Sequence, residues 1–286
     1  MPAGDPAVLA EAARELSRGR RVALCTVVEK VGSGPRDPGA KLAVLEDGVF
    51  GTLGGGEFER LVVEAAREAL QDGRPRLLRF SFTESGSPGA IDTGHLCGGE
   101  STVFIDVLVP DPRLFLVGSG HVALQVHRVA RVLGWRAVVV DDHPETATPE
   151  RFPGAELRVG DPVEGLSRDP PGPEDLLFIA HGEPDVEYRV LRFLCGLERL
   201  PRYVGLLGSR TKGGKLLARL RDEGLDFSRL KGVLRVPSGL DLGSDTPGEV
   251  AVSVVAEMLA VVKGVTPPGS MSVADGMIEA LERGSD

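Results

Sequence analysis

The sequence predicts an α/β protein in which a smaller α+β domain precedes a C-terminal Rossmann-like domain with a doubly wound parallel sheet. After residue 112, short apolar segments alternate with amphipathic ones, which is typical of a parallel sheet covered by helices. A glycine turn of the dinucleotide-binding type begins at Gly118. A Pro-Asp-Pro break at 110–112 separates this region from an N-terminal part that lacks the alternation.

These observations predict a domain over residues 1–110 and a Rossmann-like domain over 111–264. The last stretch, 265–286, begins with Pro-Pro-Gly and ends in a short amphipathic segment. It is either an arm that packs on another copy of the chain or a frayed tail, and the tail is the simpler interpretation.

Composition excludes several classes of function. The chain has 286 residues and a formal net charge of −9, which disfavours nucleic acid and anionic membranes as partners. No apolar run reaches the roughly 20 residues of a membrane-spanning helix, and the N-terminus lacks the order of a signal peptide. We therefore expect a cytoplasmic protein. The absence of asparagine, with only two glutamines, points to a thermophilic source.

The three cysteines are Cys25, Cys97 and Cys195, and no two of them form a Cys-x-x-Cys pair. This spacing gives no disulfide framework and predicts no metal site of the zinc type.

The N-terminal domain is expected to be mixed. A Glu-Asp-Gly turn at 46–48 predicts a hairpin, and apolar residues at helical spacing from Phe58 to Ala69 predict a helix that ends at Gly73. The expected elements are helices over 6–18 and 57–71 and strands over 21–28, 41–45, 49–53, 76–82 and 101–109.

The C-terminal domain is expected to contain six strands and four main helices. The expected strands are 114–117, 137–140, 156–159, 176–180, 203–207 and 233–236. The expected helices are 121–133, 185–197, 211–223 and 247–262, the last of them strongly apolar.

The first glycine turn is the strongest local motif. Gly118, Gly120 and Ala123 occupy the three small-residue positions of the fingerprint, where glycine admits a phosphate to the start of a helix. An acidic pair, Asp141 and Asp142, ends the next strand, where a carboxylate would hold a ribose hydroxyl. The candidate binding residues here are Gly118, Ser119, Gly120, His121, Asp141 and Asp142. Such a fingerprint also persists as scaffold, so bound NAD(P) stays one of two alternatives.

A second glycine turn follows the strand at 203–207. Helix amides and two cations there suit a phosphate, although a surface helix start with solvated cations fits equally well. The candidate residues are Gly208, Ser209, Arg210 and Lys212. His181 ends the strand at 176–180, where it either binds a ligand or caps a turn.

Cys97 is the one cysteine set within a glycine turn, over 94–99. Gly98 and Gly99 leave the thiol without side-chain cover, so we expect Cys97 to face a ligand, the alternative being a buried small hydrophobe. Cys25 and Cys195 lie within apolar patterns.

No catalytic residue is predicted. Neither tyrosine, Tyr188 or Tyr203, is followed four residues later by lysine, and the chain has no Walker A pattern and no Gly-x-Ser-x-Gly elbow. An NAD(P)-dependent oxidoreductase is kept as an alternative because of the first glycine turn, and an interaction scaffold with vestigial sites is a third hypothesis.

Seven segments in fixed order cover nearly the whole chain: ALCTVVEKVGSGPRDPGAKLAV, DGVFGTLGGGEFE, HLCGGESTVFI, RLFLVGSGHVA, AHGEPDVEYRVL, YVGLLGSRTKGGKLLARL and GLDLGSDTPGEVAVSVVAEMLAV. Together they resemble the xanthine dehydrogenase accessory factor family (XdhC/CoxI). The resemblance implies a homodimeric chaperone that binds molybdenum cofactor (molybdopterin) and protects it while a cysteine desulfurase supplies the terminal sulfur. Delivery to an apo-molybdoenzyme, such as xanthine or carbon monoxide dehydrogenase, is implied as the last step.

On this resemblance, the cofactor phosphate would occupy the Gly118 or the Gly208 turn, and Cys97 would contact the soft metal centre. The chain departs from the family at two places. Glu57 stands where many members have cysteine, and Ala180 and Gly182 flank His181 where the family often has threonine and aspartate. Glutamate is a hard oxygen donor and does not replace a thiolate toward a soft metal.

Overall fold

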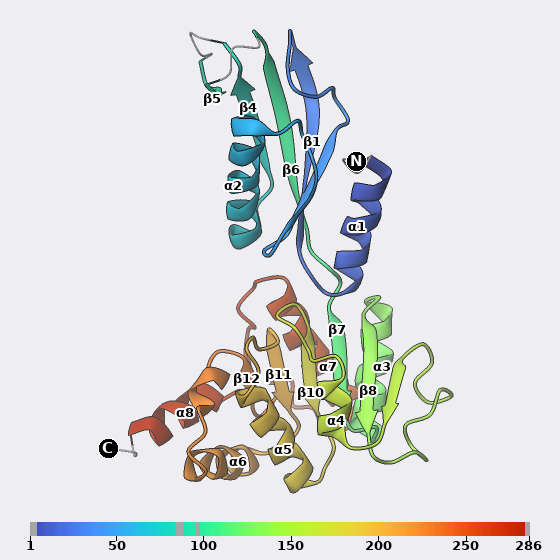
Figure 1. The fold of residues 1–286 in the computed structure, drawn as a ribbon. Helices are drawn as coiled ribbons and strands as arrows, with labels where there is room; N and C mark the ends of the chain where they lie inside the picture. Colours follow the sequence, from blue (N-terminus) through green and yellow to red (C-terminus); the bar gives the residue numbers. More distant parts are fainter. Residues whose placement is uncertain (1–4, 84–87, 95–97, 284–286) are drawn as a thin grey trace. The chain divides into compact units, whose positions relative to one another are not determined.

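The computed structural model describes residues 5–83, 88–94 and 98–283. The chain divides into two compact units, residues 1–110 and 111–286 (Figure 1).

The first unit is a six-stranded sheet with two helices. Its strands are β1 (Val22–Val31), β2 (Lys41–Val44), β3 (Val49–Gly51), β4 (Arg76–Ser81), β5 (Ile91–Asp92) and β6 (Glu100–Leu108). Its helices are α1 (Asp5–Ser17) and α2 (Gly56–Asp72). The strand order is β3-β2-β1-β6-β4-β5, and all neighbours are antiparallel except β4 and β5. The expected hairpin is present as β2 and β3, and α2 ends at Gly73 as predicted.

The two helices cover opposite faces of this sheet, because successive residues of β1 point to opposite sides. Ala23, Cys25 and Val27 pack in the cluster that includes Phe58 of α2. Val22 instead packs with residues of α1 in a second, smaller cluster. The alternation of apolar residues in β1 thus gives the unit a core on each side of the sheet.

The second unit is a six-stranded, fully parallel sheet. Its strands are β7 (Arg113–Val117), β8 (Arg136–Asp141), β9 (Glu156–Val159), β10 (Leu176–Ile179), β11 (Tyr203–Leu206) and β12 (Leu234–Arg235). Its helices are α3 (His121–Val132), α4 (Pro162–Ser167), α5 (Pro184–Cys195), α6 (Arg210–Asp222), the short 3-10 helix η1 (Phe227–Leu230), α7 (Pro247–Val262) and α8 (Ala274–Arg283). The order β12-β11-β10-β7-β8-β9 is that of a doubly wound Rossmann sheet and confirms the predicted fold class.

Helices lie on both faces of the parallel sheet (Figure 1). Helices α3 and α7 pack on one face, with Leu114 and Leu116 of β7, and helices α4, α5, α6 and α8 pack on the other, with Phe115 and Val117. The strand order reverses between β7 and β10, so the carboxyl ends of these strands flank the crevice where Rossmann folds bind ligands. Within the described ranges, no helix combines the length and apolar character needed to cross a membrane.

The structure differs from expectation at the C-terminus. The interpretation of 265–286 as a frayed tail is wrong for residues 274–283, which form α8. Ala274 and Ile278 of α8 are fully buried in the core against α6 and η1. The helix was not predicted because only one amphipathic face of about three turns marks it in the sequence.

Three further short elements, β5, α4 and η1, were also not expected. The strand expected over 233–236 is only Leu234–Arg235, since it lies at the edge of the sheet and Pro237 follows it closely.

Candidate functional site

The first glycine turn follows β7 and packs closely against the ends of β8 and β10. Gly118 follows β7 with φ of +102°, and a Cβ there would lie 2.6 Å from the carbonyl oxygen of Ala180, at the end of β10. The Gly118 amide donates to the Val140 carbonyl of β8 at 2.9 Å. Both the backbone angle and the close approach require glycine at this position.

Beyond this turn, the start of α3 is open. Gly120 is the N-cap residue, no side chain caps the helix, and a Cβ on Gly120 would meet no atom within 4 Å. The amides of the first helical turn therefore keep the capacity to bind an anion. His121 is the first residue of this helix, and it is exposed.

Asp141 is used within the protein. Its Oδ2 accepts hydrogen bonds from the amide and the hydroxyl of Ser119, both at 2.5 Å, and its side chain is almost fully buried. Burial acts to raise the pKa of Asp141, but the hydrogen bonds from Ser119 and His143 outweigh it and the net shift is downward. Asp142 is the other carboxylate at the position where Rossmann folds bind a ribose hydroxyl, and its side chain is 41 % exposed.

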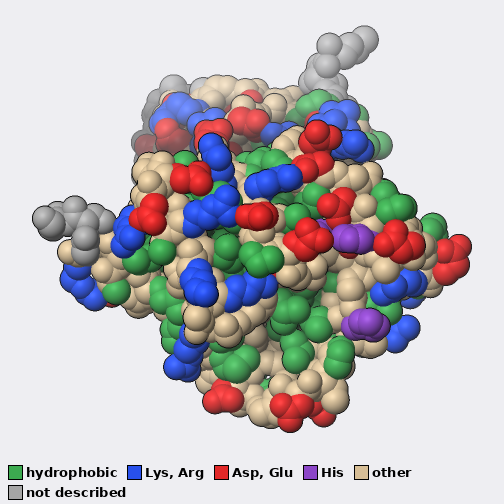
Figure 2. Space-filling view, turned by 90° about the horizontal axis from the view of Figure 1, so that it is seen from below, with side chains coloured by type: hydrophobic (Ala, Val, Ile, Leu, Met, Phe, Trp, Pro, Cys, Tyr) green, Lys and Arg blue, Asp and Glu red, His purple; other side chains and the backbone are tan. Residues whose placement is uncertain are grey.

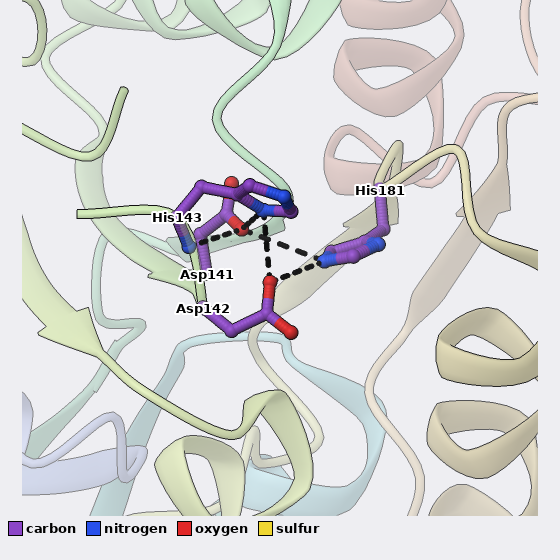
Figure 3. A group of neighbouring side chains, drawn as sticks. All are labelled: Asp141, Asp142, His143 and His181. Atoms are coloured by element: carbon purple, nitrogen blue, oxygen red, sulfur yellow. Dashed lines mark hydrogen bonds and ion pairs between the residues drawn. The ribbon is translucent and has the colours of Figure 1, made fainter. Parts of the chain in front are cut away.

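Two histidines converge on this acidic pair (Figure 3). His143 Nδ1 lies 3.0 Å from Asp141 Oδ1 and 2.8 Å from Asp142 Oδ1. His181 Nε2 lies 3.0 Å from Asp142 Oδ1 and 3.4 Å from Asp141 Oδ1. One donor atom from each of the four residues lies within 4.8 Å of the others, so their four side chains form one group.

The two histidines of the group differ in environment. The His143 side chain is 46 % exposed, and its hydrogen bond to Asp141 raises its pKa. The His181 side chain is only 1 % exposed, and its Nδ1 is buried without a hydrogen-bond partner. Figure 2 shows one histidine side chain flanked by acidic side chains on the face seen from below. His181 therefore contacts the acidic pair. A role as a turn cap alone does not account for this contact.

The second glycine turn is less open than the first. The Ser209 hydroxyl caps α6 by accepting from the Lys212 amide at 3.2 Å. The Lys212 ammonium lies 2.5 Å from a carboxylate oxygen of Glu187, which is fully buried, and donates to the Leu207 carbonyl. The Lys212 charge, which was expected to bind a phosphate, is thus paired with Glu187 inside the protein. Arg210 at the same turn is exposed.

In the first unit, Cys97 lies outside the described residues, and its predicted contact with a ligand stays a prediction. Gly98 has room around its Cβ position, whereas a Cβ on Gly99 would lie 2.3 Å from the Ser33 carbonyl oxygen. Gly99 is therefore needed for packing against the 31–33 loop. Glu57, at the family's cysteine position, lies in the first turn of α2 and pairs with Arg60 at 2.5 Å.

The other two thiols are in the cores. Burial raises the pKa of Cys25 to about 12, and burial is also the largest cause of the rise at Cys195, to about 11. Both cysteines are buried, as their apolar sequence contexts indicated.

Most of the predicted residues of the second unit meet at one edge of its sheet. Gly118, Ser119, Gly120, His121, Asp141, Asp142 and His181 follow β7, β8 and β10, and Gly208 to Lys212 follow the neighbouring strand β11. His143 was not among the predicted site residues, although it directly follows the acidic pair. Its signal in the sequence is the run Asp-Asp-His at a strand end, a pattern that also serves a ribose contact or a turn.

The parallel sheet and the glycine turn with its open helix end define a Rossmann-type binding protein. Residues 114–258 match the XdhC Rossmann domain, and residues 15–81 match the XdhC and CoxI family. The chain belongs to this family, which confirms the resemblance found in its motifs.

Two curated relatives are similar to the chain. The uncharacterized protein YqeB of Escherichia coli K12 is 34 % identical over 269 residues, which cover 92 % of this chain and 48 % of YqeB. A probable xanthine dehydrogenase subunit of Bacillus subtilis 168 is 31 % identical over 172 residues, which cover 59 % of this chain and 49 % of the relative. The chain thus spans about half the length of the curated relatives it matches.

A crystal structure of a xanthine dehydrogenase from Bacillus halodurans is also similar. It is 20 % identical, with a TM-score of 0.48, and the match covers 96 % of this chain and 100 % of that structure's chain.

Proposed function

We propose that this protein is an accessory factor that binds molybdenum cofactor in the cytoplasm and inserts it into a molybdoenzyme of the xanthine dehydrogenase or carbon monoxide dehydrogenase type. It holds the cofactor while a cysteine desulfurase partner supplies the terminal sulfur, and it works as a homodimer. The membership of both units in the XdhC and CoxI family carries this proposal. The name of the Bacillus subtilis relative supports the client class.

The open start of α3 favours the Gly118 turn over the Gly208 turn for the cofactor phosphate. An anion at α3 would meet helix amides that no side chain caps. At α6, Ser209 already caps the helix and Lys212 is paired with Glu187, so fewer donors are left. Asp141 is held at the first turn by the Ser119 amide, so one carboxylate lies beside the candidate phosphate position.

Cys97 is the thiol proposed to contact the molybdenum centre. A soft metal with sulfur ligands favours a thiolate neighbour, and the other two thiols are buried. Glu57 is excluded as a substitute, because its hard carboxylate is paired with Arg60.

The phosphate position can be tested with purified protein loaded with molybdenum cofactor and then gel-filtered. Wild type should retain pterin fluorescence and molybdenum. Gly120→Val should lower retention about tenfold or more, because its side chain would occupy space beside the α3 amides, where a Cβ meets no other atom within 4 Å. Arg210→Ala, at the other glycine turn, is the matched control and should retain the cofactor. Absence of retention by wild type contradicts the proposal, and loss in Arg210→Ala alone moves the phosphate to the second turn.

The thiol can be tested in the same preparation. Cys97→Ala should lose molybdenum while the pterin phosphate contacts persist. In the folded apoprotein at pH 8, Cys25 and Cys195 should react slowly with a disulfide reagent, since their pKa values of about 12 and 11 leave almost no thiolate. One fast thiol is expected, and it should vanish in Cys97→Ala. Fast labelling that persists in this variant would place the reactive thiol elsewhere.

An NAD-dependent oxidoreductase is the second candidate, favoured by the uncapped start of α3 with the exposed Asp142 carboxylate at the ribose position. The acidic pair disfavours the extra phosphate of NADP. Titration with NADH, followed by fluorescence, should give binding that Gly120→Val abolishes. Absence of binding by wild type removes this candidate.

A further inference from the structure

The Asp141, Asp142, His143 and His181 group brings together four side chains of the kinds that bind metal ions. Its four nitrogen-to-oxygen contacts run around a closed ring and measure 3.0, 2.8, 3.0 and 3.4 Å. An ion bound tetrahedrally at about 2.0–2.1 Å from its ligands separates neighbouring ligand atoms by about 3.3 Å. Four of the six edges of such a tetrahedron are therefore matched to within about 0.5 Å, and the remaining two donor pairs lie within 4.8 Å.

Protons alone can hold these contacts only by being shared. Each imidazole nitrogen in the ring carries at most one proton, and each faces an oxygen from both Asp141 and Asp142. Two protons thus serve four contacts, each through one hydrogen bond divided between two oxygens. A cation at the centre instead accepts all four lone pairs at once.

The charge of the group also favours a cation. Within the described part of the chain, neither Asp141 nor Asp142 forms an ion pair with lysine or arginine. Asp141 is 3 % exposed, and buried carboxylates are usually paired or bound to metal. Two carboxylates and two neutral imidazoles together neutralise the charge of a divalent ion.

His181 supplies an independent observation. Its side chain is 1 % exposed, and Nε2 is aimed into the ring while Nδ1 has no protein partner. Among the described residues, the polar contacts of this buried side chain are those of Nε2 with Asp141 and Asp142, at the end of β8.

We propose that Asp141, Asp142, His143 and His181 bind one divalent transition-metal ion of the zinc type. Imidazole nitrogen and monodentate carboxylate oxygen are ligands that zinc accepts in tetrahedral sites. Four protein ligands close the coordination shell, which is the arrangement of structural rather than catalytic zinc. The proposal of this metal site does not rest on molybdenum cofactor binding.

The ion would order the first glycine turn. Asp141 binds it through Oδ1, while Oδ2 accepts from the Ser119 amide and hydroxyl of the turn. The ion also joins the end of β8 to the end of β10, the two strands that flank β7 in the sheet. Metal binding is therefore coupled to the geometry of the turn that precedes α3.

The test uses the full chain stripped of metal with a chelator and titrated with Zn²⁺ against a chromophoric competitor. Wild type should bind one Zn²⁺ per chain, and its Co²⁺ form should show the intense visible absorption of a tetrahedral ion. Asp142→Asn and His181→Ala should each weaken binding about 10-fold to 100-fold or more. Asp142 is partly exposed, so Asp142→Asn keeps the test valid if His181→Ala does not fold.

Glu145→Gln is the matched control. It removes one exposed negative charge two residues from His143 without removing a ligand, and it should bind Zn²⁺ as wild type does. The proposal is overturned if wild type fails to compete for Zn²⁺, if Co²⁺ gives the weak spectrum of an octahedral ion, or if Glu145→Gln loses as much affinity as Asp142→Asn. None of these readouts requires pterin, so failure of cofactor retention leaves the metal result intact.

Discussion

Lys212 illustrates how a residue predicted to bind a ligand can instead serve the fold. Its ammonium pairs with Glu187, whose carboxylate is fully buried and also accepts from the Gly182 amide. Removing one partner of a buried ion pair leaves the other charge without compensation. We expect Lys212→Met to lower the free energy of unfolding by about 2–4 kcal/mol, measured by urea denaturation at pH 7.

Two comparisons give this prediction its control. Lys215→Met changes an exposed lysine of the same helix and should alter stability by less than about 0.5 kcal/mol. Adding Glu187→Gln to Lys212→Met should recover part of the loss, because the unpaired charge is removed with its partner. If Lys212→Met has the same free energy of unfolding as wild type, the ammonium is not needed for the fold. Lys212 would then again be a candidate for binding a phosphate.

At the residue scale, local spacing was enough to predict the glycine turn. Gly118 and Gly120 sit at a fixed separation after an apolar strand, and the close approach of Gly118 to Ala180 is the physical reason for that pattern. The contact between His181 and Asp142 could not be predicted in this way, because the two residues are 39 positions apart. Only the order of β8, β7 and β10 in the sheet brings them together.

Among the helices, α2 begins in an unusual way. The N-cap Gly55 offers no side chain, and Glu59 reaches back from the first turn to accept from the Leu53 amide at 2.7 Å and the Gly55 amide at 3.1 Å. Burial acts to raise the pKa of Glu59, but hydrogen bonds from Thr52 and from three backbone amides outweigh it and the net shift is downward. The ionised carboxylate therefore stabilises both the glycine turn and the start of α2.

This arrangement predicts a pH dependence of stability. Because the pKa of Glu59 is lower in the folded than in the unfolded chain, its stabilisation is complete above the unfolded-state pKa of about 4.3. The stabilisation is lost as the pH falls through the lower folded-state value. Glu59→Gln should cost about 1 kcal/mol at pH 7, and its difference from wild type should shrink as urea unfolding is repeated at decreasing pH below about 4.3.

Glu57→Gln is the control for this prediction, since it changes an exposed carboxylate of the same helical turn that pairs with Arg60. Its effect at pH 7 should stay within about 0.5 kcal/mol. A Glu59→Gln difference that stays constant from pH 7 to pH 3 would show that the carboxylate charge does not hold the turn.

At the element scale, periodicity predicted the long helices and strands with ends close to those observed, and it missed the short elements. The two residues of β5 carry no periodic signal, and their pairing with β4 depends on the path of the chain. Helix α4 did carry a signal, because Asp161 caps it and Pro162 occupies its first turn. Six residues are too few for an apolar period to reinforce that signal.

For the molecule as a whole, the change of rhythm after residue 110 corresponds to two separate cores. The cores of the second unit pack both faces of its parallel sheet and include Ile278 of α8 as well as β7. For the second unit, the sequence predicted the six strands and the helices α3, α5, α6 and α7, but not α4. The reversal of strand order between β7 and β10, which creates the crevice, follows from pairing that no local pattern records.

Because the second unit has its own cores and contains all four residues of the proposed metal group, residues 111–286 should fold when expressed alone. We expect one cooperative transition in thermal unfolding followed by circular dichroism. Excess Zn²⁺ should raise the midpoint by several degrees, because a ligand that binds only the folded state stabilises it. The same fragment with Asp142→Asn should unfold cooperatively but respond weakly to Zn²⁺. A fragment that unfolds without a cooperative transition would show that the second unit depends on residues 1–110, whereas a cooperative fragment that ignores Zn²⁺ would contradict the metal site alone.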